Sequence, residues 1–288
     1  MNINRASFIA VLFSVFTCSA VGQDLNNRSL TAVLKNKETK IAIGHRKMDK
    51  YDDTPENSLS AIRQAIGKID MIEVDVRRTA DGRFVLSHDG TVDRATNGSG
   101  EVSKLKYKDL RKMRLLQGQK LSNERIPSLE EVLKLAKNKI YLYIHLKTTD
   151  IGVFKLIDKY KMLDQVLFLP SVKPNDWMFQ EIELASKDYP QAMFAPWCSE
   201  YASYQALIEK YPKQMVVQVY IRKQHEDNIP EVKKVFDLLQ ANGKIIILNV
   251  LFSKYNNIDK DRDVYRDLDI LNPTLLFSDH PLQYKGRF

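Results

Sequence analysis

Residues 71–76 read MIEVDV, and this alternation is the feature that decides the fold. Successive side chains of a strand point to opposite faces, so Glu73 and Asp75 share one face and the apolar residues share the other. In a closed barrel the apolar face would pack under helices and the two carboxylates would point inward. Buried paired carboxylates repel each other unless a positive group lies between them. A hard divalent cation is the simplest such partner.

Strand-like and helix-like segments alternate along the rest of the chain. Further strands are predicted at residues 41–45, 140–147, 166–169, 192–195, 215–221, 244–251 and 275–278. Helices are predicted at residues 30–35, from a cap at Thr54, from a capping box at Ser128, and at 151–162, 176–187, 200–210 and 230–241. Eight strands separated by helices predict a parallel TIM barrel. An open doubly wound sheet competes, but no Gly-rich phosphate loop follows an early strand.

One departure from strict alternation follows the second strand. A turn at Asp81 and Gly82 leads into an extended run that ends at His88, and a polar excursion of about forty residues precedes the next helix. In a barrel, such an excursion rises over the face that carries the active site. We therefore expect a small inserted subdomain at about residues 90–125, within a barrel domain of residues 23–288.

The N-terminus is typical of an exported protein. Arg5 precedes a short apolar stretch and small residues at 20–22, as in a signal peptide cleaved after Gly22. The stretch is too short to span a bilayer, so no transmembrane segment is expected in the mature chain. Lipidation of Cys18 is the weaker alternative, because Phe16 and Thr17 are poor residues to precede a lipidated cysteine. The expected location is the periplasm or the exterior.

The composition and charge of the chain limit the kinds of molecule that it is expected to bind. The 288 residues are 44% hydrophobic and carry a formal charge of +8, of which the signal contributes one arginine. The excess is spread along the chain without an aromatic-interleaved basic motif, so nucleic-acid binding is not expected. An anionic small molecule or a lipid-derived substrate fits better. Cleavage would leave Cys198 alone, and it is best explained as a small buried side chain.

Histidines and fixed cations stand at other strand ends. His145 and Lys147 share the inward face of the third strand, His45 and Arg46 end the first, and His88 follows the extended run. Histidine exchanges protons near neutral pH, and a pair of histidines can act as base and acid. Arginine and lysine can hold an anion. Each residue alone is more simply explained as structural, but together they favour phosphoester cleavage.

At this point the sequence resembles the glycerophosphodiester phosphodiesterase family. The resemblance is carried by GHR at residues 44–46, TPENS at 54–58, IEVDV at 72–76, TADG at 79–82, SHD at 87–89, IPSLEE at 126–131 and SDHP at 278–281. It implies a TIM barrel with a small insertion and hydrolysis of glycerophosphodiesters to sn-glycerol 3-phosphate and an alcohol.

The resemblance also implies roles for individual residues. His45 and His88 would be the acid and base, without an order between them, and Arg46 and Lys147 would hold the phosphate. Glu73 and Asp75 would bind a divalent cation, Mg²⁺ or Ca²⁺. Trp197 is a candidate to line the substrate pocket, although core packing explains it nearly as well.

Two positions depart from the family pattern. Lys47 stands where a glycine is usual, and His145 stands where the family has its third metal carboxylate. An imidazole removes one negative charge and replaces a hard oxygen with a softer nitrogen, so Ca²⁺ should bind less well. The site could hold Mg²⁺ through two carboxylates, prefer a transition metal through His145, or have lost its metal and activity.

Three functions are therefore compared. We favour a metal-dependent glycerophosphodiester phosphodiesterase. A phospholipase D-like or cyclising phosphodiesterase is the second enzyme hypothesis, and a cyclic phosphate product would identify it. The third hypothesis is a barrel that binds phosphodiesters without cleaving them, because of His145. The sequence leaves the head group, the metal and the oligomeric state open.

Overall fold

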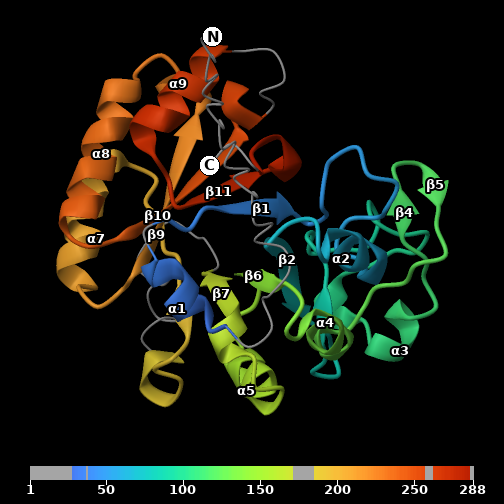
Figure 1. The fold of residues 1–288 in the computed structure, drawn as a ribbon. Helices are drawn as coiled ribbons and strands as arrows, with labels where there is room; N and C mark the ends of the chain where they lie inside the picture. Colours follow the sequence, from blue (N-terminus) through green and yellow to red (C-terminus); the bar gives the residue numbers. More distant parts are fainter. Residues whose placement is uncertain (1–27, 37, 171–184, 257–261, 286–288) are drawn as a thin grey trace, which may run out of the picture.

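The computed structural model describes residues 28–36, 38–170, 185–256 and 262–285. Eight parallel strands form a nearly closed barrel, in the order β8-β7-β6-β2-β1-β11-β10-β9 (Figure 1). They are β1 (Ile41–His45), β2 (Met71–Arg78), β6 (Tyr141–Leu146), β7 (Val166–Leu169), β8 (Met193–Phe194), β9 (Val216–Arg222), β10 (Ile245–Phe252) and β11 (Leu275–Ser278). The predicted TIM barrel is confirmed, and each predicted strand is present.

The barrel closes weakly between β8 and β9. The two strands meet beyond the end of β8 through a parallel bridge between Trp197 and Gln218, in which the Gln218 amide donates to the Pro196 carbonyl at 2.9 Å. The other barrel neighbours pair along two to six residues each. This seam is therefore the least strongly bonded part of the wall.

Alternation along the strands separates two apolar layers. Ile72 and Val74 of β2 belong to the layer under the helices, together with buried residues of α4 (Leu129–Ala136) and α5 (Gly152–Lys159). Tyr143 and Phe277 belong to the layer that fills the barrel interior. The helices are α1 (Leu30–Lys35), α2 (Leu59–Ala65), α3 (Tyr107–Leu110), α4 (Leu129–Ala136), α5 (Gly152–Lys159), α7 (Tyr204–Lys210), α8 (Ile229–Ala241) and α9 (Arg262–Leu271). The predicted inward face of β2 is confirmed.

Helix α1 covers the end of the barrel at which the strands begin. Its Leu30 and Leu34 are buried in the interior layer. The carbonyl of Arg28 accepts a hydrogen bond at 3.0 Å from Tyr141, the first residue of β6. Burial of these leucines closes this end, so the opposite end, where the strands finish, is the end at which a substrate can enter.

The inserted subdomain follows the second barrel strand. Strand β3 (Phe84–Leu86) pairs with β2 in an antiparallel ribbon, and the chain then forms α3 and the small hairpin of β4 (Leu116–Gln117) and β5 (Lys120–Leu121). These elements gather at one side of the barrel beyond α2 and α4 (Figure 1). Val92, Val102 and Leu110 belong to a separate small apolar cluster there.

One helix start was predicted wrongly, and one helix was not predicted. Helix α2 is capped by the Ser58 hydroxyl, which accepts from the Ala61 amide at 3.0 Å, and not by Thr54. Asn57 has a φ of 53°, and this left-handed residue separates the Thr54 turn from the helix. Helix α9 was not predicted, although its buried residues Val264, Leu268 and Leu271 recur at helical spacing.

Two predictions fall largely or wholly outside the described residues: the signal at 1–22 and most of the helix at 176–187. The capping box at Ser128 is present, with the Glu131 amide donating to the Ser128 hydroxyl. Within the described ranges, no helix combines the length and the apolar character needed to cross a bilayer.

Candidate active site

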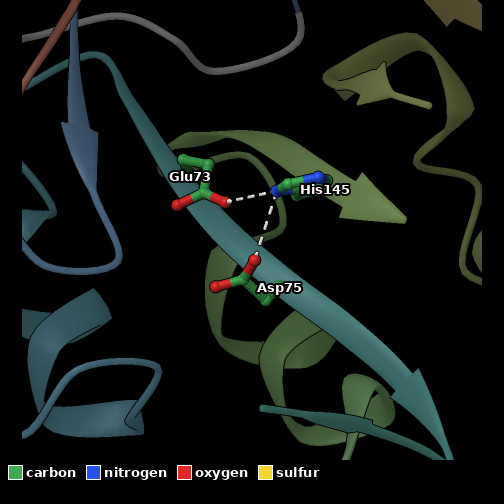
Figure 2. A group of neighbouring side chains, drawn as sticks. All are labelled: Glu73, Asp75 and His145. Atoms are coloured by element: carbon green, nitrogen blue, oxygen red, sulfur yellow. Dashed lines mark ion pairs between the residues drawn. The ribbon is translucent and has the colours of Figure 1, made fainter. Parts of the chain in front are cut away.

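Strands β2 and β6 bring two carboxylates and an imidazole together at the end of the barrel opposite α1. Their register places His145 beside Asp75 and Tyr143 beside Glu73. His145 Nδ1 lies 3.7 Å from Glu73 Oε1 and 3.3 Å from Asp75 Oδ1, and both carboxylates point toward it (Figure 2). One ligand atom from each residue lies within 4.8 Å of the others. The three predicted metal ligands are thus adjacent.

Burial makes this cluster electrostatically unusual. Glu73 is 1% exposed and Asp75 is 0% exposed. Burial and the charge of Asp75 raise the pKa of Glu73 well above its ordinary value. Burial lowers the pKa of His145 despite the nearby Asp75, so its imidazole is neutral at pH 7 and can offer a lone pair. A neutral imidazole does not balance the two acids.

Asp75 is the centre of the polar network. Burial alone would raise its pKa, but His145, Arg46 and Lys147 hold it below its ordinary value, so the group is ionised. Arg46 Nε lies 3.3 Å from Oδ2, and Lys147 Nζ lies 3.6 Å from Oδ1. The predicted phosphate-holding residues therefore already face the carboxylate, and a bound anion would lie beside a site with positive charge on two sides.

The loop after β1 positions Arg46. Its backbone has a φ of 61°, in the left-handed region, and its carbonyl accepts from the Asn57 amide at 3.0 Å. A left-handed conformation at a residue with a side chain is strained, and such strain concentrates at functional sites. Arg46 Nη1 also lies 3.5 Å from Glu56 Oε2. This geometry turns the guanidinium back over Asp75.

The two predicted catalytic histidines lie beside the acids. His45 lies opposite Glu73 in the pairing of β1 with β2. His88 follows Ser87, whose amide donates to the Asp75 carbonyl at 3.1 Å. Both histidines therefore lie along the edge of β2 that faces β1, and His145 lies on the other edge.

Each histidine has its own carboxylate on Nδ1. His45 Nδ1 lies 2.7 Å from Asp279 Oδ1, and His88 Nδ1 lies 2.6 Å from Asp89 Oδ1. Burial would raise the pKa of Asp279, but the hydrogen bond from His45 lowers it to about 2. Because Nδ1 is engaged, Nε2 is the nitrogen of each ring that is left to exchange a proton with a substrate.

A series of ion pairs extends from His88. Asp89 Oδ2 lies 2.5 Å from Arg94 Nε, and Arg94 Nη2 lies 2.5 Å from Glu56 Oε1. Burial lowers the pKa of His88, while Asp75 and the Asp89 hydrogen bond oppose that effect. These ion pairs link the inserted subdomain to the loop that carries Arg46.

Sequence reasoning missed several positioning residues. Asn57, Glu56, Asp89 and Asp279 all lie in the motifs quoted above, but no role was predicted for them. Asn57 Nδ2 donates to Asp75 Oδ2 at 3.0 Å. These residues could have been noticed in the sequence, because they are polar and belong to motifs at strand ends. Only the fold shows which residues they contact.

Trp197 lies on the β8 side of the barrel, in edge contact with Tyr220 at 4.8 Å between ring centroids. Its indole Nε1 is buried without a hydrogen-bond partner among the described residues, as is Gln218 Nε2. The Tyr143 hydroxyl donates to Gln218 Oε1 at 2.9 Å, so Gln218 is held with its amide nitrogen unpaired. Unpaired buried donors are costly and suit a ligand that supplies acceptors.

The comparisons with known proteins agree with this geometry. The sequence model of the glycerophosphoryl diester phosphodiesterase family matches residues 45–215, which include the residues of the cluster and His88. The chain is 38% identical over 127 residues to glycerophosphodiester phosphodiesterase 1 of Mus musculus. That match covers 42% of this chain and 38% of the mouse protein, so the chain corresponds to less than half of that relative's length.

Solved structures share the fold. A glycerophosphoryl diester phosphodiesterase from Parabacteroides distasonis superposes with a TM-score of 0.72 at 22% identity, covering 90% of this chain and 91% of that one. An Oleispira antarctica phosphodiesterase in complex with sn-glycerol 3-phosphate has a TM-score of 0.66 at 21% identity, with 86% and 96% of the two chains covered. From the family match over more than half of its length, the chain belongs to the glycerophosphoryl diester phosphodiesterase family.

Proposed function

We propose that this protein hydrolyses glycerophosphodiesters to sn-glycerol 3-phosphate and an alcohol. The observation that carries the proposal is the buried Glu73, Asp75 and His145 cluster beside two histidines that are each bonded to a carboxylate. Family membership and the activity in the names of its relatives support the same reaction. The structure of the Oleispira antarctica relative in complex with sn-glycerol 3-phosphate is consistent with this product.

The residues of the cluster fit a divalent cation. Glu73 Oε2 is buried and has no hydrogen-bond partner within the described ranges, so its lone pairs are unsatisfied. A carboxylate whose pKa is raised by burial and by a second acid is stabilised when a cation joins the pair. Glu73, Asp75 and His145 would hold this ion. A bound cation would polarise a phosphoryl oxygen and stabilise the negative charge that develops on it.

The remaining steps belong to side chains of the chain itself. Arg46 and Lys147 bind the non-bridging phosphate oxygens and offset the charge of the pentavalent transition state. One histidine takes a proton from the attacking water through Nε2, and the other gives a proton to the oxygen of the leaving alcohol. Asp279 and Asp89 keep the two rings oriented and stabilise the imidazolium form of each.

The donor set favours a transition metal over Ca²⁺. Ca²⁺ prefers six to eight oxygen ligands, whereas this cluster offers two carboxylates and one imidazole nitrogen. Imidazole suits ions such as Mn²⁺, Co²⁺ and Zn²⁺, and the neutral form of His145 leaves its lone pair available. We infer that one of these ions supports the highest activity, with Mg²⁺ weaker and Ca²⁺ weakest.

We also infer that residues 1–22 direct export to the periplasm or the exterior. The motivation is the charged, apolar and small-residue order of that segment. Expression of the full chain in a bacterial host, followed by N-terminal sequencing of the protein released from the periplasm, tests this inference. A first residue of Gln23 supports cleavage after Gly22, and an intact Met1 in the cytoplasm contradicts it.

The test of the activity is an assay on a panel of glycerophosphodiesters after removal of metals and reloading with single ions. Release of sn-glycerol 3-phosphate, measured by a coupled dehydrogenase, is the expected result. A cyclic glycerol phosphate detected by ³¹P NMR would instead show attack by the neighbouring hydroxyl. Binding without product under every metal would show a non-catalytic barrel.

A further inference from the structure

A second hollow lies beside the catalytic cluster. A cavity of about 640 Å³ opens between the end of β2, the loop after β6 and the inserted subdomain. Arg77 and Arg78 contribute one wall, and Lys147 is shared between this cavity and the candidate active site. Its volume lies in the range of small-molecule sites, about 300–1,000 Å³.

The cavity is connected to the catalytic groups through Arg77. Alternation along β2 places Arg77 on the same face as Glu73 and Asp75, one step nearer the open end. Its Nε and Nη2 donate to the His88 carbonyl at 3.1 and 2.8 Å. A phosphodiester whose phosphate lies on Lys147 would therefore extend one arm past His88 into this space.

The walls are polar and carry residual positive charge. Arg78 Nε is paired with Asp150 at 2.5 Å, and the wall acid Glu101 is paired with Lys104 at 2.7 Å. Arg77 donates to a backbone carbonyl and makes no ion pair among the described residues, although Asp75 and Asp89 lie near enough to stabilise its charge. Hydroxyl groups complete the lining, from Thr79, Thr91, Ser103, Thr148 and Thr149.

No aromatic residue lines the cavity among the parts of the chain that the structure describes. Quaternary ammonium groups are recognised in proteins mainly by aromatic faces, which attract the cation without requiring hydrogen bonds. A choline head group here would find positive charge and hydroxyls that it cannot hydrogen-bond. A polyol offers both donors and acceptors to the same walls.

We propose that this cavity is the leaving-alcohol site and selects polyol head groups, such as glycerol and inositol, over choline. The inference rests on the proposed phosphodiesterase activity. The trimethylammonium group of choline cannot form hydrogen bonds. If it filled the cavity, the hydroxyl and N–H donors of the wall would lose water and stay unpaired, which disfavours choline relative to a polyol. Lys147 binds the phosphate at the mouth, and Arg77 contributes positive charge and spare N–H donors further in.

The experiment compares kcat/KM for glycerophosphoinositol and glycerophosphoglycerol with kcat/KM for glycerophosphocholine, using the full chain loaded with its best metal. We expect a preference of about 10-fold or more for the polyols. In Arg77→Met the ratio should fall at least about threefold. The ratio is the readout because any effect of Arg77 on His88 acts on all substrates alike. Thr149→Val, which keeps the volume but removes a hydroxyl, should also lower it.

Arg125→Met is the matched control. Arg125 also donates to backbone carbonyls, those of Arg111 and Lys112, but it does not line the cavity. An unchanged ratio in this variant, with a lowered ratio in the other two, supports the proposal. Equal or better cleavage of the choline substrate by the unaltered protein overturns it.

Failure of the activity is distinguishable from failure of this inference. If no metal supports cleavage of any substrate, the proposed reaction is wrong. Calorimetric titration of the metal-loaded protein with glycerophosphoinositol and with glycerophosphocholine then tests whether the cavity still prefers the polyol. Tighter binding of the inositol compound that weakens in Arg77→Met supports polyol recognition. Equal binding of both compounds, or no binding of either, contradicts it.

Discussion

Asn57 and Asp75 exchange two hydrogen bonds between the loop after β1 and strand β2. Asn57 Nδ2 donates to Asp75 Oδ2 at 3.0 Å, and the Asp75 amide donates to Asn57 Oδ1 at 3.0 Å. The first bond fixes the orientation of the central carboxylate, and the second ties the loop to β2. Asn57 itself has a φ of 53°, which asparagine tolerates better than most residues. One side chain therefore serves both the loop conformation and the site.

Asn57→Gly tests this pairing, because glycine keeps the backbone conformation and removes only the side chain. We expect the free energy of unfolding to fall by about 1–3 kcal/mol, since a buried carboxylate oxygen and a buried amide lose their partners. Turnover should fall together with stability. Chemical denaturation and steady-state kinetics measure the two effects.

Asn138→Gly is the control for that variant. Asn138 has a φ of 58° and bonds to the Gln165 side chain, before the start of β6 and so at the end of that strand opposite His145. Unchanged turnover in Asn138→Gly with lowered turnover in Asn57→Gly is expected. Equal turnover in both variants would show that Asn57 does not orient Asp75.

Replacing His145 should change which metal binds. His145→Glu supplies a third carboxylate oxygen, so we expect Ca²⁺ and Mg²⁺ affinity to rise by about 10-fold or more relative to Zn²⁺. His145→Ala removes a ligand and should weaken Mn²⁺ and Zn²⁺ binding by at least about 10-fold. Isothermal titration calorimetry on the metal-free protein gives both values without relying on activity. Identical metal affinities in the three proteins would exclude His145 as a ligand.

The two histidines should be required for chemistry and dispensable for folding. His45→Ala and His88→Ala should each lower kcat by about 10²–10⁴-fold. His225→Ala, in which an unrelated histidine near the end of β9 is lost, serves as the control. Circular dichroism checks that all three variants fold. Full activity in both active-site variants would reject the assignment.

The pH dependence of the reaction should respond to Asp89. Burial lowers the pKa of His88 below 6.5, and the Asp89 hydrogen bond raises it in part. Removing the carboxylate in Asp89→Asn therefore lowers this pKa further, whether His88 acts as acid or base. The limb of the profile of kcat/KM against pH that belongs to His88 should move to lower pH.

Asp93→Asn is the control, because Asp93 is exposed and accepts from the Gly100 amide rather than from a histidine. No displacement of either limb is expected in this variant. A limb that moves to higher pH in Asp89→Asn would contradict the assigned coupling, since loss of a nearby negative charge cannot favour the imidazolium.

Asp279 is predicted to act on turnover and not on substrate binding. The pKa of Asp279 is lowered to about 2, so this carboxylate stays ionised through the working pH range and holds His45 by Nδ1. Asp279→Asn keeps the size but removes the charge that stabilises the imidazolium. We expect kcat to fall with little change in KM. A raised KM at unchanged kcat would place Asp279 in substrate binding instead.

Local sequence patterns were sufficient to predict the strands and most of the helices. The period-two alternation that places Glu73 and Asp75 on one face depends only on strand geometry, and so does the inward face that His145 shares with Tyr143. The Ser128 capping box is likewise a relation between residues three apart. Such features follow from neighbours in the chain, so the eight strands, most of the helices and the three clustered side chains could be predicted.

Features that depend on distant contacts could not be predicted in this way. Thr54 resembles a helix cap, yet the helix begins at Ser58 because Asn57 is drawn into a left-handed turn by its bonds to β2. Helix α9 is a different case, because Val264, Leu268 and Leu271 stand at helical spacing and its apolar face was visible in the sequence. At the start of α2, tertiary contacts outweigh local propensity.

The sequence by itself therefore determined the barrel, its inward-facing acids and the family to which it belongs. Only the tertiary structure decided that His45 pairs with Asp279 and that His88 pairs with Asp89 rather than with Asp75. It alone showed the cavity beside Lys147. The physical reason is that periodicity specifies the face on which a side chain lies, whereas the partner it meets depends on how distant strands and loops pack around the same end of the barrel.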